Sequence, residues 1–152
     1  MGPNGEVVHS IASHPATFWI TAYKTLCRVA ELAEKHGVIL NLEHLNTKLD
    51  HPGYPLAFVE DAAKLVSEVG SSRIRLLLDL YHTQVQQGNL FDIIHKHGHL
   101  IGYVHVADVP GRHEPGITRA LREVGYEGVI GLEAFPAADE GLAFTRFREA
   151  FG

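Results

Sequence analysis

The sequence predicts an α/β protein built on a parallel β-sheet. Stretches whose apolar residues follow helical spacing alternate along the chain with four short, mostly apolar stretches. These short stretches lack the regular polar–apolar alternation of a sheet with one wet face, so we expect the strands to be buried on both faces. Parallel strands joined by helical crossovers satisfy both observations. No linker or low-complexity segment divides the chain, and we expect a single domain over residues 1–152.

The first half of the chain is predicted to hold two helices and two strands. Apolar residues recur at helical spacing over 19–33 and 56–66, and a glycine suited to a helix end follows each stretch. The strands are VILNLE (38–43) and RIRLLLD (73–79). Each helix therefore leads directly into a strand.

The second half repeats this alternation. The strands are LIGYVHV (100–106) and GVIGLE (128–133), and helices are predicted over 90–97, 117–124 and 142–151. Gly98 closes the first of these helices.

Charge and cysteine content exclude several classes of protein. The net charge is -5, from 13 basic and 18 acidic residues, and no run of Lys or Arg suggests a nucleic-acid or anionic-membrane surface. No apolar stretch is long enough to span a membrane, and the first residues lack the pattern of a signal peptide. Cys27 is the single cysteine, so no internal disulfide can form. We therefore expect a cytoplasmic protein whose partner is a small molecule.

Every predicted strand ends in a side chain that can bind a metal ion. These residues are Glu43, Asp79, His105 and Glu133, separated by 36, 26 and 28 positions. The carboxyl ends of parallel strands lie at one edge of a sheet, where ligands and active sites of such folds gather. We expect the four side chains to converge there.

Three carboxylates and one imidazole form a mostly oxygen site, which suits Mn²⁺ or Mg²⁺. Without a cation, the carboxylates would repel one another and at least one pKa would rise. The competing interpretation is that each acid is an ordinary strand-end or helix-capping residue. Asn46 and Tyr54, in the loop after Glu43, either cover the site or belong to a surface loop.

Six segments resemble the hydroxypyruvate isomerase family of the xylose-isomerase-like TIM barrels. The segments are LNLEHLN with DHPGYPL, DLYHTQ with QGNL, HVADVPGRHEPG, and GYEGVIGLEAFP. The resemblance implies a metal held by Glu43, Asp79, His105 and Glu133. The third ligand, His105, is the residue found in the related ketose 3-epimerases, whereas many hydroxypyruvate isomerases have glutamine there.

The resemblance also implies a reaction. In such an isomerase, Glu43 and Glu133 move a proton between neighbouring substrate carbons through an enediolate that the metal stabilises. His82 and Arg112 match positions that hold substrate oxygens. Conversion of hydroxypyruvate to tartronate semialdehyde is the leading example. A metal-dependent DNA-repair nuclease on a related barrel is a further alternative, against which the acidic net charge argues.

The predicted architecture is half of a TIM barrel. A complete barrel has eight βα units and about 250 residues, whereas this chain supplies four strands that resemble the C-terminal half of the family. The open edges and apolar interior would need a cover, and we expect a homo-oligomer in which copies close a barrel. The alternative is a non-catalytic barrel half that acts only through assembly.

Overall fold

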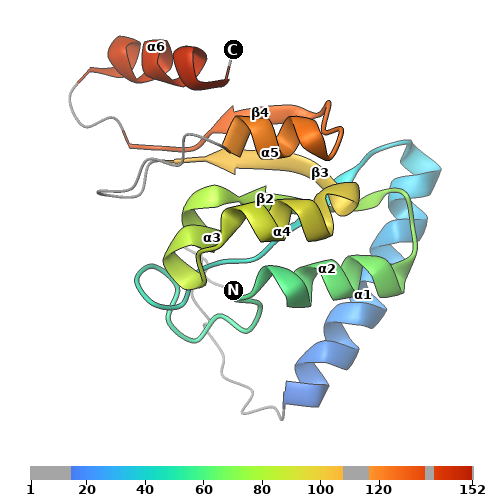
Figure 1. The fold of residues 1–152 in the computed structure, drawn as a ribbon. Helices are drawn as coiled ribbons and strands as arrows, with labels where there is room; N and C mark the ends of the chain where they lie inside the picture. Colours follow the sequence, from blue (N-terminus) through green and yellow to red (C-terminus); the bar gives the residue numbers. More distant parts are fainter. Residues whose placement is uncertain (1–14, 108–116, 136–138, 152) are drawn as a thin grey trace.

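The computed structural model describes residues 15–107, 117–135 and 139–151, which form one four-stranded parallel sheet with surrounding helices (Figure 1). The strands lie in the order β1-β2-β3-β4, so spatial order follows chain order. They are β1 (Leu40–Glu43), β2 (Ile74–Asp79), β3 (Ile101–Val106) and β4 (Val129–Leu132). The helices are α1 (Pro15–His36), α2 (Val59–Val69), α3 (Leu80–Gln86), α4 (Leu90–His97), the 3₁₀ turn η1 (Gly98–Leu100), α5 (Ile117–Glu123) and α6 (Glu140–Phe151). The predicted parallel α/β class is confirmed.

The largest difference from the sequence prediction is α3, a helix that begins where β2 ends. The Asp79 carboxylate caps it by accepting a hydrogen bond from the backbone N–H of His82 at 2.7 Å. A short helix with few apolar residues gives no periodic signal, which explains why it was not predicted. The boundaries of α2 also differ, since it runs three residues later than predicted at both ends and stops at Gly70, whose φ is 68°.

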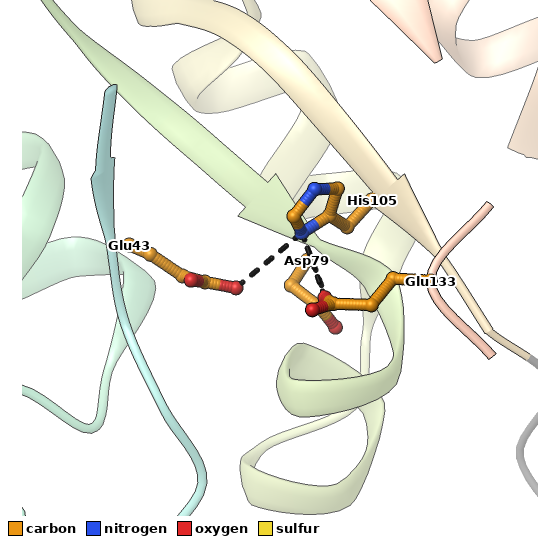
Figure 2. Close-up of side chains that lie close together, drawn as sticks. All are labelled: Glu43, Asp79, His105 and Glu133. Carbon is orange, nitrogen blue, oxygen red and sulfur yellow. Dashed lines mark ion pairs between the residues drawn. The ribbon is translucent and has the colours of Figure 1, made fainter. Parts of the chain in front are cut away.

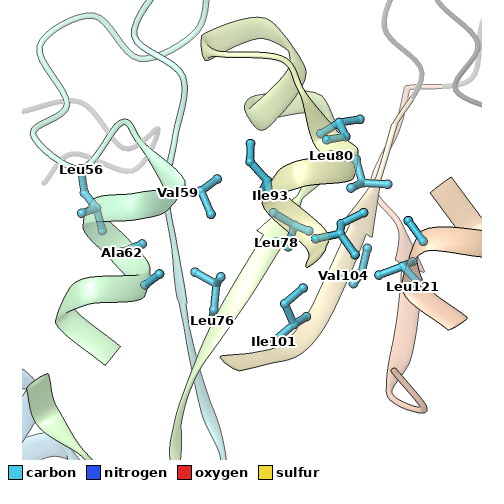
Figure 3. Close-up of a cluster of buried hydrophobic side chains, with 14 of the residues drawn as sticks. Leu56, Val59, Ala62, Leu76, Leu78, Leu80, Ile93, Ile101, Val104 and Leu121 are labelled. Carbon is cyan, nitrogen blue, oxygen red and sulfur yellow. The ribbon is translucent and has the colours of Figure 1, made fainter. Parts of the chain in front are cut away.

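The hydrophobic core lies between the sheet and α2, α3, α4 and α5 (Figure 3). Leu76 and Leu78 of β2 and Val104 of β3 are fully buried there, facing Val59 and Ile94 of the helices. Each such side chain contributes about 1.5–3 kcal/mol by leaving water. The core thus fixes which face of each strand points toward the helices.

The opposite face of β2 carries Arg75, Leu77 and Asp79, which alternate with the core leucines. The Arg75 guanidinium donates to the backbone carbonyls of His99 and Ile101, at 2.8 and 3.1 Å, across the sheet. This face is the more polar one. It ends, at the carboxyl edge of the sheet, in Asp79.

α1 is the longest helix among the described residues, with 22 residues. Its Ile20, Tyr23 and Leu32 side chains are exposed, although Ala30 and Ala33 are buried against the rest of the structure. Within the described part of the chain, neither this helix nor a shorter one combines the length and apolarity that a membrane crossing requires.

Candidate metal centre

The four predicted metal ligands lie together at the carboxyl edge of the sheet (Figure 2). Glu43 and Asp79 are the last residues of β1 and β2, and His105 pairs with Asp79 in the register of β2 and β3. Glu133 directly follows β4, where its backbone N–H donates to the carbonyl of Val106 at 3.0 Å. The parallel sheet therefore brings together residues that are far apart in sequence.

One ligand atom from each residue lies within 4.8 Å of the others. His105 Nδ1 is central, at 2.8 Å from Glu133 Oε2, 3.6 Å from Glu43 Oε1 and 3.7 Å from Asp79 Oδ2. Asp79 is only 2% exposed, whereas the Glu133 side chain is 60% exposed. The cluster is thus anchored at its Asp79 side and open to solvent at Glu133.

The carboxylates are poorly stabilised as anions when no cation is present. Burial raises the pKa of Asp79 to about 7, and the negative charges of Glu43 and Glu133 raise it further. The hydrogen bond from His82 and the charge of His105 act in the opposite direction. Burial and Glu133 likewise raise the pKa of Glu43, although His105 opposes the rise. A divalent cation would offset the repulsion that raises both pKa values.

The position of His105 Nδ1 fits a ligand atom. This nitrogen is buried and forms no hydrogen bond of acceptable geometry, although three carboxylates surround it within 3.7 Å. The competing interpretation is an ion pair between protonated His105 and Glu133 at 2.8 Å. Three oxygen donors with one imidazole suit Mn²⁺ or Mg²⁺, so the residues present fit the ion expected from the sequence.

A buried polar pair that the sequence analysis missed lies next to the cluster and connects the elements that carry Glu43 and Asp79. His44, directly after Glu43, is fully buried and its Nε2 lies 2.9 Å from Thr83 Oγ1. The Thr83 hydroxyl donates to the backbone carbonyl of Asp79 at 2.6 Å. The Thr83 oxygen must therefore accept the His44 hydrogen bond, which ties the end of β1 to the start of α3. No spacing rule connects residues 39 positions apart, so this pair could not be predicted from the sequence.

Of the two residues expected to hold substrate oxygens, His82 lies beside the cluster, with its backbone N–H on Asp79 Oδ1. Arg112 lies outside the described residues. Asn46, for which the sequence left open a covering role and a surface loop, is buried, and Tyr54 is partly buried. Asn46 contacts the His82 ring through its side-chain nitrogen, 2.7 Å from Nδ1. The roles of the six predicted site residues stay predictions.

Comparisons with known proteins give concordant matches. The family model described as "Xylose isomerase-like TIM barrel" matches residues 4–148. A Homo sapiens protein named "Putative hydroxypyruvate isomerase" is 35% identical over 134 residues, which are 81% of this chain and 48% of that protein. A D-psicose 3-epimerase of Enterocloster bolteae is 33% identical over 121 residues, 75% of this chain and 39% of its own length.

The solved structure of an AP endonuclease, family 2, from Brucella melitensis superposes with a TM-score of 0.82 at 28% identity. The match covers 92% of this chain and 57% of that chain. The chain spans about half the length of the curated hydroxypyruvate-isomerase relatives that it matches.

Proposed function

This chain belongs to the xylose isomerase-like TIM barrel family, and on that premise we propose that it isomerises or epimerises a small hydroxy-carbonyl compound. The resemblance to hydroxypyruvate isomerases that the sequence motifs predicted is confirmed, as is the TIM-barrel-like fold. The observation that carries the proposal is the convergence of Glu43, Asp79, His105 and Glu133 within 4.8 Å. A sugar or keto-acid substrate is the chemistry that the named relatives support.

Glu43, Asp79, His105 and Glu133 are the residues that would hold Mn²⁺ or Mg²⁺. When bound, such an ion would supply a Lewis acid that polarises a carbonyl group and stabilises negative charge on neighbouring oxygens. Asp79, the most buried carboxylate of the set, anchors the site to the core. His105 Nδ1, at the centre of the cluster, would supply the nitrogen ligand.

The two glutamates are placed to move protons. In the proposed reaction of hydroxypyruvate, one glutamate removes a proton from the carbon that carries the hydroxyl group, and the neighbouring carbonyl carbon receives a proton. The hydroxyl proton passes to the former carbonyl oxygen, so the carbon that carried the hydroxyl becomes the aldehyde and the former carbonyl carbon carries a hydroxyl. One proton moves between the carbons and one between the oxygens, and no oxidant is required. Glu133, with its 60% exposed side chain, is accessible to a substrate from solvent. Burial raises the pKa of Glu43, which suits a group that exchanges protons.

A calorimetric titration with Mn²⁺ near neutral pH tests the site. We expect about one ion per chain for the wild type and loss of binding for Glu133→Gln, since the substitution removes one anionic ligand. Glu127→Gln is the matched control, because Glu127 is an exposed glutamate outside the cluster. If Glu133→Gln bound Mn²⁺ as tightly as Glu127→Gln does, Glu133 would not be a ligand.

Turnover is tested with hydroxypyruvate in D₂O, by following tartronate semialdehyde and deuterium on the substrate carbons. We expect product formation that requires Mn²⁺ or Mg²⁺ and that Glu133→Gln abolishes while Glu127→Gln retains it. If the chain binds the metal but neither forms product from hydroxypyruvate or a ketose nor incorporates deuterium into them, the alternative of a non-catalytic barrel half is favoured.

A nuclease is the second candidate, because the structure from Brucella melitensis carries the name AP endonuclease. The net charge of -5 argues against a DNA-binding surface. Binding of duplex DNA that weakens steeply with salt would favour this candidate over the isomerase.

A further inference from the structure

Asn46 lies in the loop between β1 and α2 and is fully buried there. Its side-chain oxygen Oδ1 accepts two backbone hydrogen bonds, from Leu49 at 3.0 Å and from Asp50 at 3.1 Å. Backbone N–H groups can only donate, so they determine which end of the amide is the oxygen. The NH₂ end of Asn46 must therefore face the other way.

Two donors of Asn46 converge on one ring nitrogen of His82. The side-chain Nδ2 lies 2.7 Å from His82 Nδ1, and the Asn46 backbone N–H donates to the same atom at 3.2 Å. The second proton of the amide goes to Asp50 Oδ2, 2.6 Å away. Because both groups that face Nδ1 are donors, Nδ1 must accept and carries no proton.

The proton of the neutral His82 ring is therefore on Nε2. Within the described part of the chain, Nδ1 is the ring atom that takes part in the hydrogen bonds of the His82 ring, as their acceptor. Nε2–H is left as a donor for an oxygen atom of a ligand. The contacts of Asn46 thus select one of the two tautomers of His82.

Asp50 and Tyr81 hold the Asn46 amide in this orientation. The Tyr81 hydroxyl donates to Asp50 Oδ2 at 2.9 Å. Burial raises the pKa of Asp50, but the hydrogen bonds from Asn46 and Tyr81 outweigh it and lower the pKa overall. An ionised Asp50 can only accept hydrogen bonds, so it keeps the donor end of the amide turned toward it.

The His82 ring is close to the metal-ligand cluster. Its backbone N–H donates to Asp79 Oδ1 at 2.7 Å, at the start of α3. Burial is the main cause that lowers the pKa of His82, the charges of His51 and Asp50 come next, and the charges of Glu133 and His105 also act on it. His82 therefore contacts one of the four clustered residues directly.

We propose that Asn46 is a positioning residue that keeps the His82 proton on Nε2, so that the ring donates a hydrogen bond to a carbonyl or enolate oxygen of the substrate. The part of this inference that concerns the substrate rests on the proposed function. The part that concerns the proton does not. A purely structural role, in which the Asn46 side chain only closes its own loop, would leave the His82 tautomer unchanged when that side chain is replaced.

The test exchanges the two side chains, Asn46→Asp together with Asp50→Asn. The new carboxylate at position 46 still offers one oxygen to the N–H groups of Leu49 and residue 50. The hydrogen bond between the side chains of residues 46 and 50 is kept with its direction reversed, because the new amide at position 50 donates to the carboxylate. The other oxygen faces His82 Nδ1 where the amide nitrogen lay, at 2.7 Å, and is closer than the backbone N–H of residue 46, at 3.2 Å. This acceptor therefore favours a proton on Nδ1. The matched control is Asn89→Asp with Asp92→Asn, since Asn89 Nδ2 donates to Asp92 Oδ2 at 2.7 Å on the exposed start of α4.

Nitrogen-15 NMR of the histidine rings reads the tautomer, in the metal-free chain and with Mg²⁺. A His82→Gln variant identifies the His82 resonances among those of the 11 histidines. We expect Nδ1 to be unprotonated in the wild type and in the control, and protonated in the exchanged variant. With hydroxypyruvate, kcat of the exchanged variant should fall about 10- to 100-fold, which is the loss typical when a residue that orients a metal-binding histidine is replaced. The control should keep the wild-type rate.

A wild-type His82 that carries its proton on Nδ1 would overturn the proposal, whatever the turnover. A switched tautomer with unchanged kcat would overturn the positioning role. A wild-type chain without turnover would count against the proposed function, and the NMR result would still decide whether Asn46 fixes the proton. If the exchanged variant does not fold, Asn46→Ser removes the side-chain donor and leaves only the backbone N–H of residue 46 on Nδ1. The share of the Nε2–H tautomer should then fall, and an unchanged share would contradict the positioning role of the Asn46 side chain.

Discussion

His44 is a buried histidine held in its neutral form. Burial lowers its pKa to about 4, and repulsion from a protonated His82 ring would act in the same direction. Its Nδ1 is buried without a hydrogen-bond partner among the described residues, whereas Nε2 donates to Thr83. A proton added to this ring would have to be accommodated without water, which is why the charged form is disfavoured.

This arrangement predicts a specific loss of stability in mild acid. In the unfolded chain, the pKa of His44 returns to 6.5, so between pH 6.5 and about 4 the unfolded state binds more protons than the folded state. The contribution is therefore complete above pH 6.5 and declines as the pH falls. From pH 6.5 to pH 5, His44 should lower the free energy of unfolding by roughly 2 kcal/mol.

Urea unfolding at pH 7 and pH 5 measures this effect, with His44→Gln as the reference because glutamine has no titratable group and retains a side-chain N–H. The stability of the wild type should fall more between the two pH values than that of the variant. Equal pH dependence in the two proteins would mean that His44 is not the residue that titrates.

The four clustered residues could be predicted from the sequence, whereas their supporting hydrogen bonds could not. Glu43, Asp79 and His105 fall at strand ends, and the rule that parallel strands share one carboxyl edge brings them together. Asn46 reaches His82 across 36 positions, and the sequence contains no periodicity that links the two. Such contacts depend on where the loop after β1 lies over α3, which only the folded chain determines.

At the scale of elements, a β-bulge in β3 sets the direction of His105. Leu76 of β2 pairs with Ile101, but the next residue, Leu77, pairs with Tyr103, so Gly102 is extra. Because side chains alternate along a strand, a shift of one residue moves every later side chain to the other face. The bulge lets Ile101 face the core while His105 reaches the cluster. The strand itself was predicted from the sequence, but this irregularity was not, because a single glycine does not identify a bulge.

Gly102→Ala should therefore weaken both the fold and the metal site. A Cβ at this position would lie 2.6 Å from the Arg75 Cβ and closer still to the Asn41 Oδ1 atom, so β3 would have to move. We expect a loss of about 1–3 kcal/mol in the free energy of unfolding, together with weaker Mn²⁺ binding. Urea unfolding and calorimetry measure the two effects.

Gly98→Ala is the matched control for this substitution. There a Cβ would lie 2.6 Å from Val124 Cγ2, at the contact between η1 and the end of α5, which does not include a residue of the cluster. This variant should lose stability but bind Mn²⁺ as the wild type does. Equal Mn²⁺ affinities for the two alanine variants would contradict the role of the bulge in placing His105.

For the whole molecule, the two edges of the sheet are the main surfaces open to contact with another chain. Among the described residues, β1 and β4 each pair with one neighbour, so the outer edge of each strand offers unpaired N–H and C=O groups. Apolar side chains stand exposed at both edges, including Ile39 at 53% before β1 and Val129 at 61% in β4. Such edges favour pairing with further strands, and two four-stranded sheets supply the eight strands of a closed barrel.

We therefore expect the purified chain to form a homodimer in which β4 of one copy meets β1 of the other. Light scattering after size-exclusion chromatography should give about twice the mass of one chain. Val129→Lys places a charge at the β4 edge and should shift the mass toward that of a single chain. Leu49→Lys is the control, since Leu49 is comparably exposed, at 68%, but lies in the loop after β1.

A wild-type mass of one chain at micromolar concentration would show that the edges do not pair with a second copy. Equal effects of the two lysine substitutions on the mass would place the interface elsewhere.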